Sequence, residues 1–262
     1  MATTALLRLE SRGYFRSSLV LVALFAIVGV FLFAAFPGFA DEAELIEEAF
    51  PPFLAGLLGF EALHTIEGFV SGYVYPLLWI VFAGIYVAYL SAGTVVRDVR
   101  ERRMDLTLSY PISRESVVLQ KVAALWVPLV VLNVGLIAVV FAGVTVLGES
   151  IDPVALAMVH LLSIPYLLVC AGIGIVLSVT LDRIETAQVS ALGLVFVLWL
   201  VEGLSEMDPD YEWLGVVAPS RYYDPSAILV HGEYAYADAG ILLIAFLALL
   251  AVAIVIFTRR DL

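Results

Sequence analysis

The sequence predicts an all-helical integral membrane protein with six transmembrane helices. Of its 262 residues, 63% are hydrophobic and only 15% are charged, and the mean hydropathy is +1.04. A soluble core of this size could not bury so much apolar surface. The apolar residues form six runs of about 20 residues, the length that an α-helix needs to cross a bilayer. Charged residues gather between these runs.

The first span is expected at residues 18–39. Before it, Arg8, Arg12 and Arg16 are spaced four apart among leucines, which predicts a short amphipathic helix over residues 1–17 on the cytoplasmic membrane surface. A signal peptide is the alternative interpretation, because small residues precede Asp41. The apolar run is longer than the usual core of about 7–15 residues in a signal peptide and ends in Pro-Gly, so we expect a retained span.

The other five spans are expected at residues 70–96, 116–147, 154–181, 187–204 and 239–257. They leave a loop at residues 97–115 on one side of the membrane and longer loops at residues 40–69 and 205–238 on the other. The whole chain, residues 1–262, is thus predicted to form a single membrane domain. The fourth span carries Ala171, Gly172 and Gly174, small residues that let two membrane helices approach closely.

The basic residues predict the orientation of the chain. Twelve of the 13 Lys and Arg residues fall on the side of the two termini and the 97–115 loop, and only Arg221 falls on the other. Because cytoplasmic loops are enriched in Lys and Arg, both termini and this loop are predicted to be cytoplasmic. Seventeen of the 25 acidic residues would then face outward. This acidic exterior suits adaptation to high salt, or alternatively a vestibule that attracts cations.

The loop between the second and third spans has a helical pattern of its own. Met104 and Leu108 lie four apart, which places them on one face of a short helix. Pro111 disfavours helical geometry at Tyr110 and would end that helix. Ser113 is a good N-cap for the next one. The segment is therefore either a plain charged loop or a surface helix that contacts a partner protein.

Residues 105–114, DLTLSYPISR, resemble the segment E-L-L-L-S-x-P, then Val or Ile, then S-R, between the second and third membrane helices of ABC-2 type transporter permeases. The likeness is close over about 25 residues, and the predicted topology extends it along the chain. That family often carries Gly-Thr where this chain has Arg102 and Arg103. The resemblance implies a coupling helix that contacts an ATPase, with these candidate contact residues: Arg102, Met104, Asp105, Leu108, Tyr110, Pro111, Ser113 and Arg114.

A second segment, APSRYYDPSAIL at residues 218–229, is similar to the S-P-F-x-Y-F-D segment before the last span of many ABC-2 permeases. The resemblance implies a loop that dips into the outer leaflet and helps to close the exit. The plain alternative is an aromatic anchor at the interface between membrane and water. The candidate gate residues are Pro219, Arg221, Tyr222, Tyr223 and Asp224.

The sequence offers little for catalysis by this chain. A P-loop needs a lysine after a glycine-rich turn, but Lys121 is the only lysine and no such turn precedes it. ATP and magnesium are therefore expected in a partner subunit, and no cofactor or metal is expected here. An intramembrane protease would need a serine with a histidine, paired aspartates or a helical metal motif, and none of these patterns occurs.

The main alternative is an ion-coupled secondary transporter or a channel. Such proteins usually carry ionisable groups within their spans, whereas here the spans are almost uncharged, with Asn133 and His160 as the candidate polar residues of a pathway. We therefore expect a multi-pass permease subunit of the cell membrane that resembles exporters. Its expected partners are cytoplasmic ATP-binding subunits, a second copy or a similar permease, and the lipid bilayer, but not nucleic acid.

Overall fold

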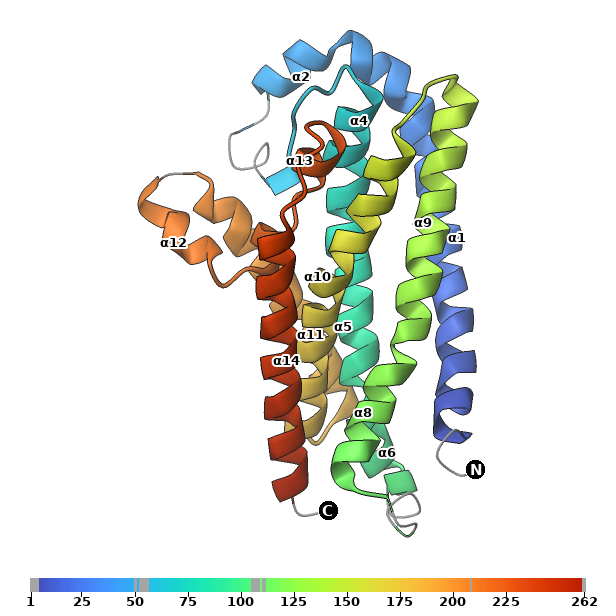
Figure 1. Ribbon diagram of the computed structural model, residues 1–262, viewed down its shortest axis with the longest axis vertical. Helices are drawn as coiled ribbons and strands as arrows, with labels where there is room; N and C mark the ends of the chain where they lie inside the picture. Colours follow the sequence, from blue (N-terminus) through green and yellow to red (C-terminus); the bar gives the residue numbers. More distant parts are fainter. Residues whose placement is uncertain are drawn as a thin grey trace.

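The computed structural model describes residues 5–49, 51, 57–104, 109, 112–207 and 209–260. All regular structure in these residues is helical, and six helices are long and apolar enough to cross a membrane (Figure 1). This confirms the predicted number of spanning helices. They cover Ser11–Asp41, Ile66–Arg100, Arg114–Leu147, Pro153–Thr180, Ile184–Ser205 and Tyr236–Arg259.

The first spanning helix differs from the prediction in its start. Helix α1 runs without a break over Ala5–Asp41, so no separate amphipathic helix precedes the span. Gly13 is the only weak helix former near the expected boundary, and one glycine costs a helix only about 1 kcal/mol. After α1, the short helix α2 (Ala43–Ala49) lies across the end of the bundle that is opposite the two termini (Figure 1).

The second span is assembled from four consecutive pieces: α4 (Ile66–Phe69), η2 (Val70–Ala83), α5 (Gly84–Ala92) and α6 (Thr94–Arg100). In η2 the backbone is wound more widely than an α-helix, and Pro76 lies inside it. Proline has no N–H to donate and its ring crowds the preceding turn, which disfavours regular α-helical winding there. The chain nevertheless continues as helix through Arg100.

The third span has a break near its lower end. Helix α8 (Arg114–Ala124) is followed after Leu125 by α9 (Trp126–Leu147). The ring of Pro128 would clash with the carbonyl of Ala124 in a continuous helix, which explains the position of the break. Ser113 caps α8 as predicted, because its side chain accepts a hydrogen bond from the Ser116 N–H at 3.2 Å.

The last three spans are α10 (Pro153–Thr180), α11 (Ile184–Ser205) and α14 (Tyr236–Arg259). Between α11 and α14 the chain makes four short helical turns. These are η3 (Pro209–Tyr211), α12 (Glu212–Gly215), η4 (Pro219–Tyr222) and α13 (Pro225–Leu229). Helix α12 projects sideways from the bundle, whereas α13 returns to its upper end (Figure 1).

Helix α10 lies at the centre of the bundle and packs against α5 and α14. In their most apolar stretches, α10 is 78% buried and the second span 72% buried, compared with 22–28% for the other four spans. The small residues of α10 permit this contact as predicted. A side chain at Gly174 would place its Cβ 2.0 Å from Ser91 Oγ and 2.3 Å from the Ala88 carbonyl oxygen.

Candidate functional site

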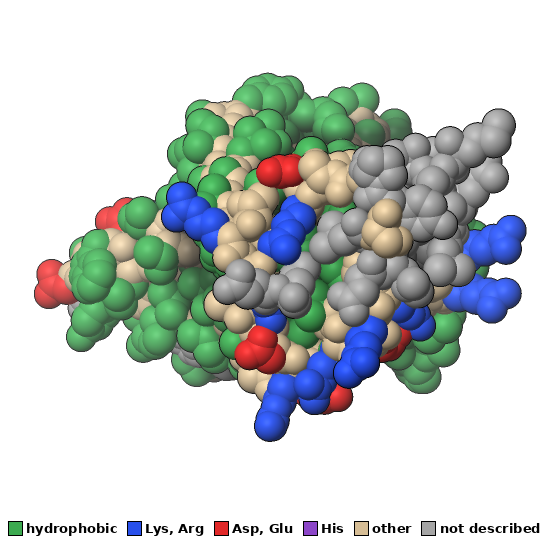
Figure 2. Space-filling view, turned by 90° about the horizontal axis from the view of Figure 1, so that it is seen from below, with side chains coloured by type: hydrophobic (Ala, Val, Ile, Leu, Met, Phe, Trp, Pro, Cys, Tyr) green, Lys and Arg blue, Asp and Glu red, His purple; other side chains and the backbone are tan. Residues whose placement is uncertain are grey.

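Basic side chains gather at the lower end of the bundle, where the two termini lie (Figure 2). The predicted coupling segment belongs to this end, but Asp105, Leu108, Tyr110 and Pro111 lie outside the described residues. Met104, expected on an exposed contact face, is only 1% exposed and belongs to the hydrophobic core. The prediction of an exposed contact face is therefore wrong for Met104, because its apolar side chain packs into the core instead of facing solvent.

Arg102 is exposed and has an unusual backbone conformation. Its φ of 55° lies in the left-handed region, where an L-residue is strained and glycine is not. This is the position at which the resembling permeases often carry Gly-Thr, and here an arginine adopts the conformation that favours glycine. The neighbouring Arg103 forms an ion pair with Glu101 at 2.7 Å, and both side chains are well exposed.

Arg114 is not a free contact residue but caps the last helix. Its guanidinium donates hydrogen bonds to the backbone carbonyls of Phe257, Thr258 and Arg260 and lies 5.9 Å from the centre of the Phe257 ring. The carbonyls at the end of a helix have no partner within it, and a cation there also suits the helix dipole. Arg114 thereby joins α8 to the end of α14.

Arg260 makes a second connection at the same end. It donates to the carbonyl of Val179, at the end of α10, at 2.7 Å and pairs with the Asp182 carboxylate. We call Arg114, Arg260 and Asp182 the basic-end clamp. The clamp ties the third, fourth and sixth spans together beside the 97–115 loop.

A buried ion pair at the base of the loop was missed by the analysis of sequence patterns. Lys121 Nζ lies 2.6 Å from Asp98 Oδ2, and the two side chains are 5% and 12% exposed. The pair joins α6 of the second span to α8 of the third. The sequence did contain a signal, since an ionisable residue inside a predicted span is rare and needs a partner.

His160 and Asn133, the predicted pathway residues, are brought together by helices α10 and α9. Asn133 Oδ1 lies 3.1 Å from His160 Nδ1, and Tyr75 Oη lies 2.9 Å from His160 Nε2. A neutral imidazole satisfies both contacts, because its Nδ1–H can donate to the amide oxygen while Nε2 accepts from the phenol. His160 is 3% exposed. The cluster links the second, third and fourth spans and has no free imidazole nitrogen.

The predicted gate segment packs into the bundle. Tyr223 is 3% exposed, donates a hydrogen bond to the Val159 carbonyl at 3.1 Å and stacks on Tyr166 with 5.9 Å between ring centres. Burial, with the nearby Tyr75 and Asp224 adding to it, raises the pKa of Tyr223 well above its usual 10. Tyr223 is therefore a core residue, and the aromatic-anchor interpretation is wrong for this side chain.

The other gate residues shape the same loop. Pro219 begins η4, and Tyr222 donates to the Val216 carbonyl at 3.0 Å. Arg221 pairs with Glu212 at 2.9 Å. Asp224 caps α13, because its carboxylate accepts hydrogen bonds from the backbone N–H groups two and three residues further along the chain, at 2.8 and 3.1 Å. The loop is thus held by its own side chains as well as by packing on α10.

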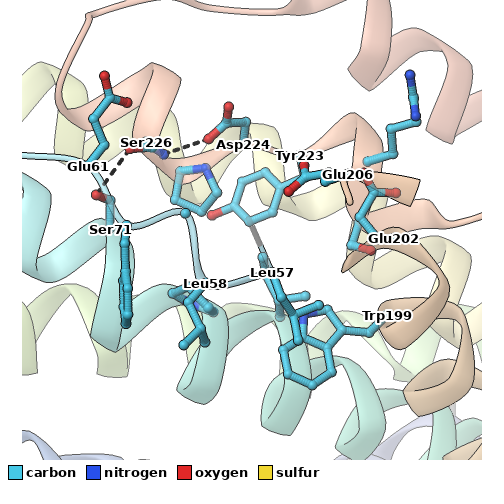
Figure 3. A pocket seen from close by; sticks show the side chains of 17 residues that line it. Leu57, Leu58, Glu61, Ser71, Trp199, Glu202, Glu206, Tyr223, Asp224 and Ser226 are labelled. Carbon is cyan, nitrogen blue, oxygen red and sulfur yellow. Dashed lines mark hydrogen bonds between the residues drawn. The ribbon is translucent and has the colours of Figure 1, made fainter. Parts of the chain in front are cut away.

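A cavity of about 420 Å³ opens beside this loop. Four acidic residues line it, and we call it the acidic cavity (Figure 3). Its carboxylates belong to Glu61, Glu202, Glu206 and Asp224. Glu202 is 9% exposed, and its Oε2 has no hydrogen-bond partner. Glu202 comes from the end of α11, so the cavity joins the fifth span to the segments around α13 and η2.

A comparison with known protein families identifies one match over almost the whole chain. The family described as ABC-2 family transporter protein matches residues 5–262. No curated protein matches the sequence. In the part of the chain that the structure describes, no group of three or more His, Cys, Asp and Glu residues is arranged to hold a metal ion.

Proposed function

The chain belongs to the ABC-2 family of transporter membrane proteins, and on this basis we propose that it is the membrane subunit of an exporter. Permease subunits of this family lack ATPase activity. We therefore assign ATP and magnesium to separate cytoplasmic subunits. A second copy of the chain, or a similar permease, completes the membrane part. The observation that supports this proposal is the family match over residues 5–262, together with the six candidate spans.

The proposed orientation puts both termini and the 97–115 loop in the cytoplasm. It is supported by the gathering of Lys and Arg at the end where the termini lie (Figure 2). A topology test uses Asp210→Cys and Ser109→Cys, two exposed positions at opposite ends, because the native Cys170 is buried. The first cysteine should react with an impermeant maleimide on intact cells, and the second only after permeabilisation. Reversed labelling would overturn the orientation. Ser205 is unsuitable because it is 3% exposed.

We propose that ATP-driven closure of the ATPase pair pushes on the 97–115 loop. The connections around the loop support this mechanism. The Lys121–Asp98 pair joins the second and third spans beside it, and the basic-end clamp joins the third span to the fourth and sixth. A displacement of the loop would therefore move several spans as a unit. The transport pathway would then open between two facing permeases.

The coupling proposal is tested by co-purification with co-expressed ATP-binding subunits. Leu108→Asp should release the ATPase while the permease stays inserted, because under this proposal the Leu108 side chain contacts the ATPase and a charge in an apolar contact is left without a partner. Ser109→Asp adds the same charge at the next residue and is the matched control, which should keep the ATPase bound. If Leu108→Asp retains normal stoichiometry and coupled activity, the segment is only a connecting loop.

An ion-coupled carrier or channel is the second candidate, and the buried carboxylate of Glu202 is the observation that favours it. The two candidates differ in what the isolated chain does in liposomes. Under the exporter proposal the chain alone should carry no flux in response to a pH gradient or a membrane potential. Gradient-driven flux that disappears in Glu202→Gln would favour the carrier instead.

A further inference from the structure

The acidic cavity contains two buried polar atoms that the described protein leaves unsatisfied. Glu202 and Ser220 are each 9% exposed, and neither Glu202 Oε2 nor Ser220 Oγ has a hydrogen-bond partner. Both residues line the cavity. Buried polar atoms are almost always hydrogen-bonded, since desolvation without a partner is costly. Because both residues line one cavity, they favour a ligand that brings hydrogen-bond donors to it.

The charges that face the cavity favour a cationic ligand. Three of the five charged residues in its lining already have partners: Glu61 contacts His231, Asp224 caps α13 and Arg221 pairs with Glu212. Glu202 and Glu206 remain, and they lie together on one side of the cavity (Figure 3). Burial and the nearby Asp224 raise the pKa of Glu206, although Arg221 opposes the shift. The lining holds four carboxylates and one guanidinium, and a bound cation would offset this excess of negative charge.

The walls of the cavity favour an organic cation over a metal ion. No metal-binding group of three or more residues is found among the described residues. Apolar and aromatic side chains, including Leu57, Leu58 and Trp199, line the space below the carboxylates (Figure 3). The volume of about 420 Å³ lies within the range of small-molecule sites. An ammonium group offers three donors, which suit a carboxylate and a hydroxyl oxygen, and an indole face also attracts cations.

We propose that the acidic cavity binds the protonated amine of an amphiphilic primary amine. The ammonium group lies between Glu202 Oε2 and Ser220 Oγ, and the apolar body extends over Trp199. If this ligand is the cargo, the inference rests on the proposed function and names its substrate class. Binding itself belongs to this chain and needs no ATPase.

The test measures binding to the purified full chain in phosphatidylcholine nanodiscs. The probe is dansylcadaverine, a fluorescent primary amine, and the readout is energy transfer from tryptophan to the dansyl group. Its neutral control is N-pentyl dansylamide, which has the same body without the ammonium group. Glu202→Gln should weaken amine binding about tenfold or more, because a charge-assisted hydrogen bond is lost. Ser220→Ala should weaken it by a factor of about two to ten.

Glu149→Gln is the matched control variant, because it removes an exposed carboxylate outside the cavity lining and should change binding less than about twofold. The proposal is overturned if the neutral dansylamide binds the native chain as tightly as the amine does. It is equally overturned if well-folded Glu202→Gln and Ser220→Ala both bind like the native chain. If Glu202→Gln does not fold, Ser220→Ala and the neutral probe still decide. A chain that does not bind the amine can still co-purify with the ATPase, so failure of this proposal can be told apart from failure of the proposed function.

Discussion

Removal of the Lys121 ammonium group should destabilise the chain far more than removal of a surface cation. In Lys121→Met, the Asp98 carboxylate stays in a site where its side chain is only 12% exposed and loses the partner at 2.6 Å. Breaking a buried ion pair by removing one partner costs roughly 3–5 kcal/mol. We expect a loss of this size in the free energy of unfolding, measured by titration with sodium dodecyl sulfate in mixed micelles.

The chain supplies its own control for this prediction. Arg103 pairs with Glu101 at almost the same distance, 2.7 Å, but the two side chains are 60% and 39% exposed. An exposed pair contributes at most about 1 kcal/mol, so Arg103→Met should have little effect. The double variant Asp98→Leu with Lys121→Met removes both charges and should recover most of the lost stability, since apolar replacements of buried pairs are often neutral.

Two results would refute this reasoning about burial. One is a Lys121→Met variant that unfolds within about 0.5 kcal/mol of the native chain, within the range of ordinary surface changes. The other is a double variant no more stable than the single one. If stability returns in the double variant while ATPase stimulation by the assembled complex does not, the pair is needed for coupling as well as for folding.

Three further predictions follow from backbone and loop contacts. Arg102→Gly should raise the unfolding free energy by roughly 0.5–1 kcal/mol, because the backbone strain removed at φ 55° outweighs the entropy that glycine adds to the unfolded chain. A decrease in the unfolding free energy would contradict the left-handed conformation at this position. Gly174→Ala should lower it by about 1–3 kcal/mol, since the new Cβ would lie 2.3 Å from a backbone oxygen, whereas Gly193→Ala, with nothing within 4 Å, should not. Glu61 raises the pKa of His231 above 6.5, so stability from their contact is complete below that pH and lost as pH rises through the raised pKa. His231→Asn should abolish that part of the pH dependence of the melting temperature, and an unchanged profile would exclude the contact.

The spanning helices could be predicted because their signal is local. The lengths of the apolar runs predicted six spans, and the small residues around Gly174 predicted that this span approaches another helix closely. Ser113 was recognised as a cap because an N-cap side chain bonds within its own first turn. The start of α1 was predicted less well, since arginines spaced along an amphipathic stretch do not interrupt a helix that continues into a span.

The side-chain partners at the candidate sites could not be predicted from the same patterns. Arg114 binds carbonyls more than 140 residues further along the chain, and no local periodicity encodes that choice. The spacing of Met104 fits one face of a surface helix, but the packing of the spans determines that its side chain is buried. Glu202 falls within the span predicted at residues 187–204, yet its unsatisfied oxygen and the Ser220 hydroxyl come to line one cavity only because the loop folds back.

The buried ion pair also determines how this protein responds to chemical reagents. Lys121 is the only lysine in the sequence, and its side chain is 5% exposed. Succinimide esters and aldehydes, which react with uncharged, accessible amines, therefore find no accessible lysine side chain on the folded chain. Cross-links to an ATPase subunit are therefore not expected through a lysine side chain of this chain, whereas carboxylates and introduced thiols can form them. A sudden gain of lysine acylation during turnover would report that the second and third spans had separated at their base.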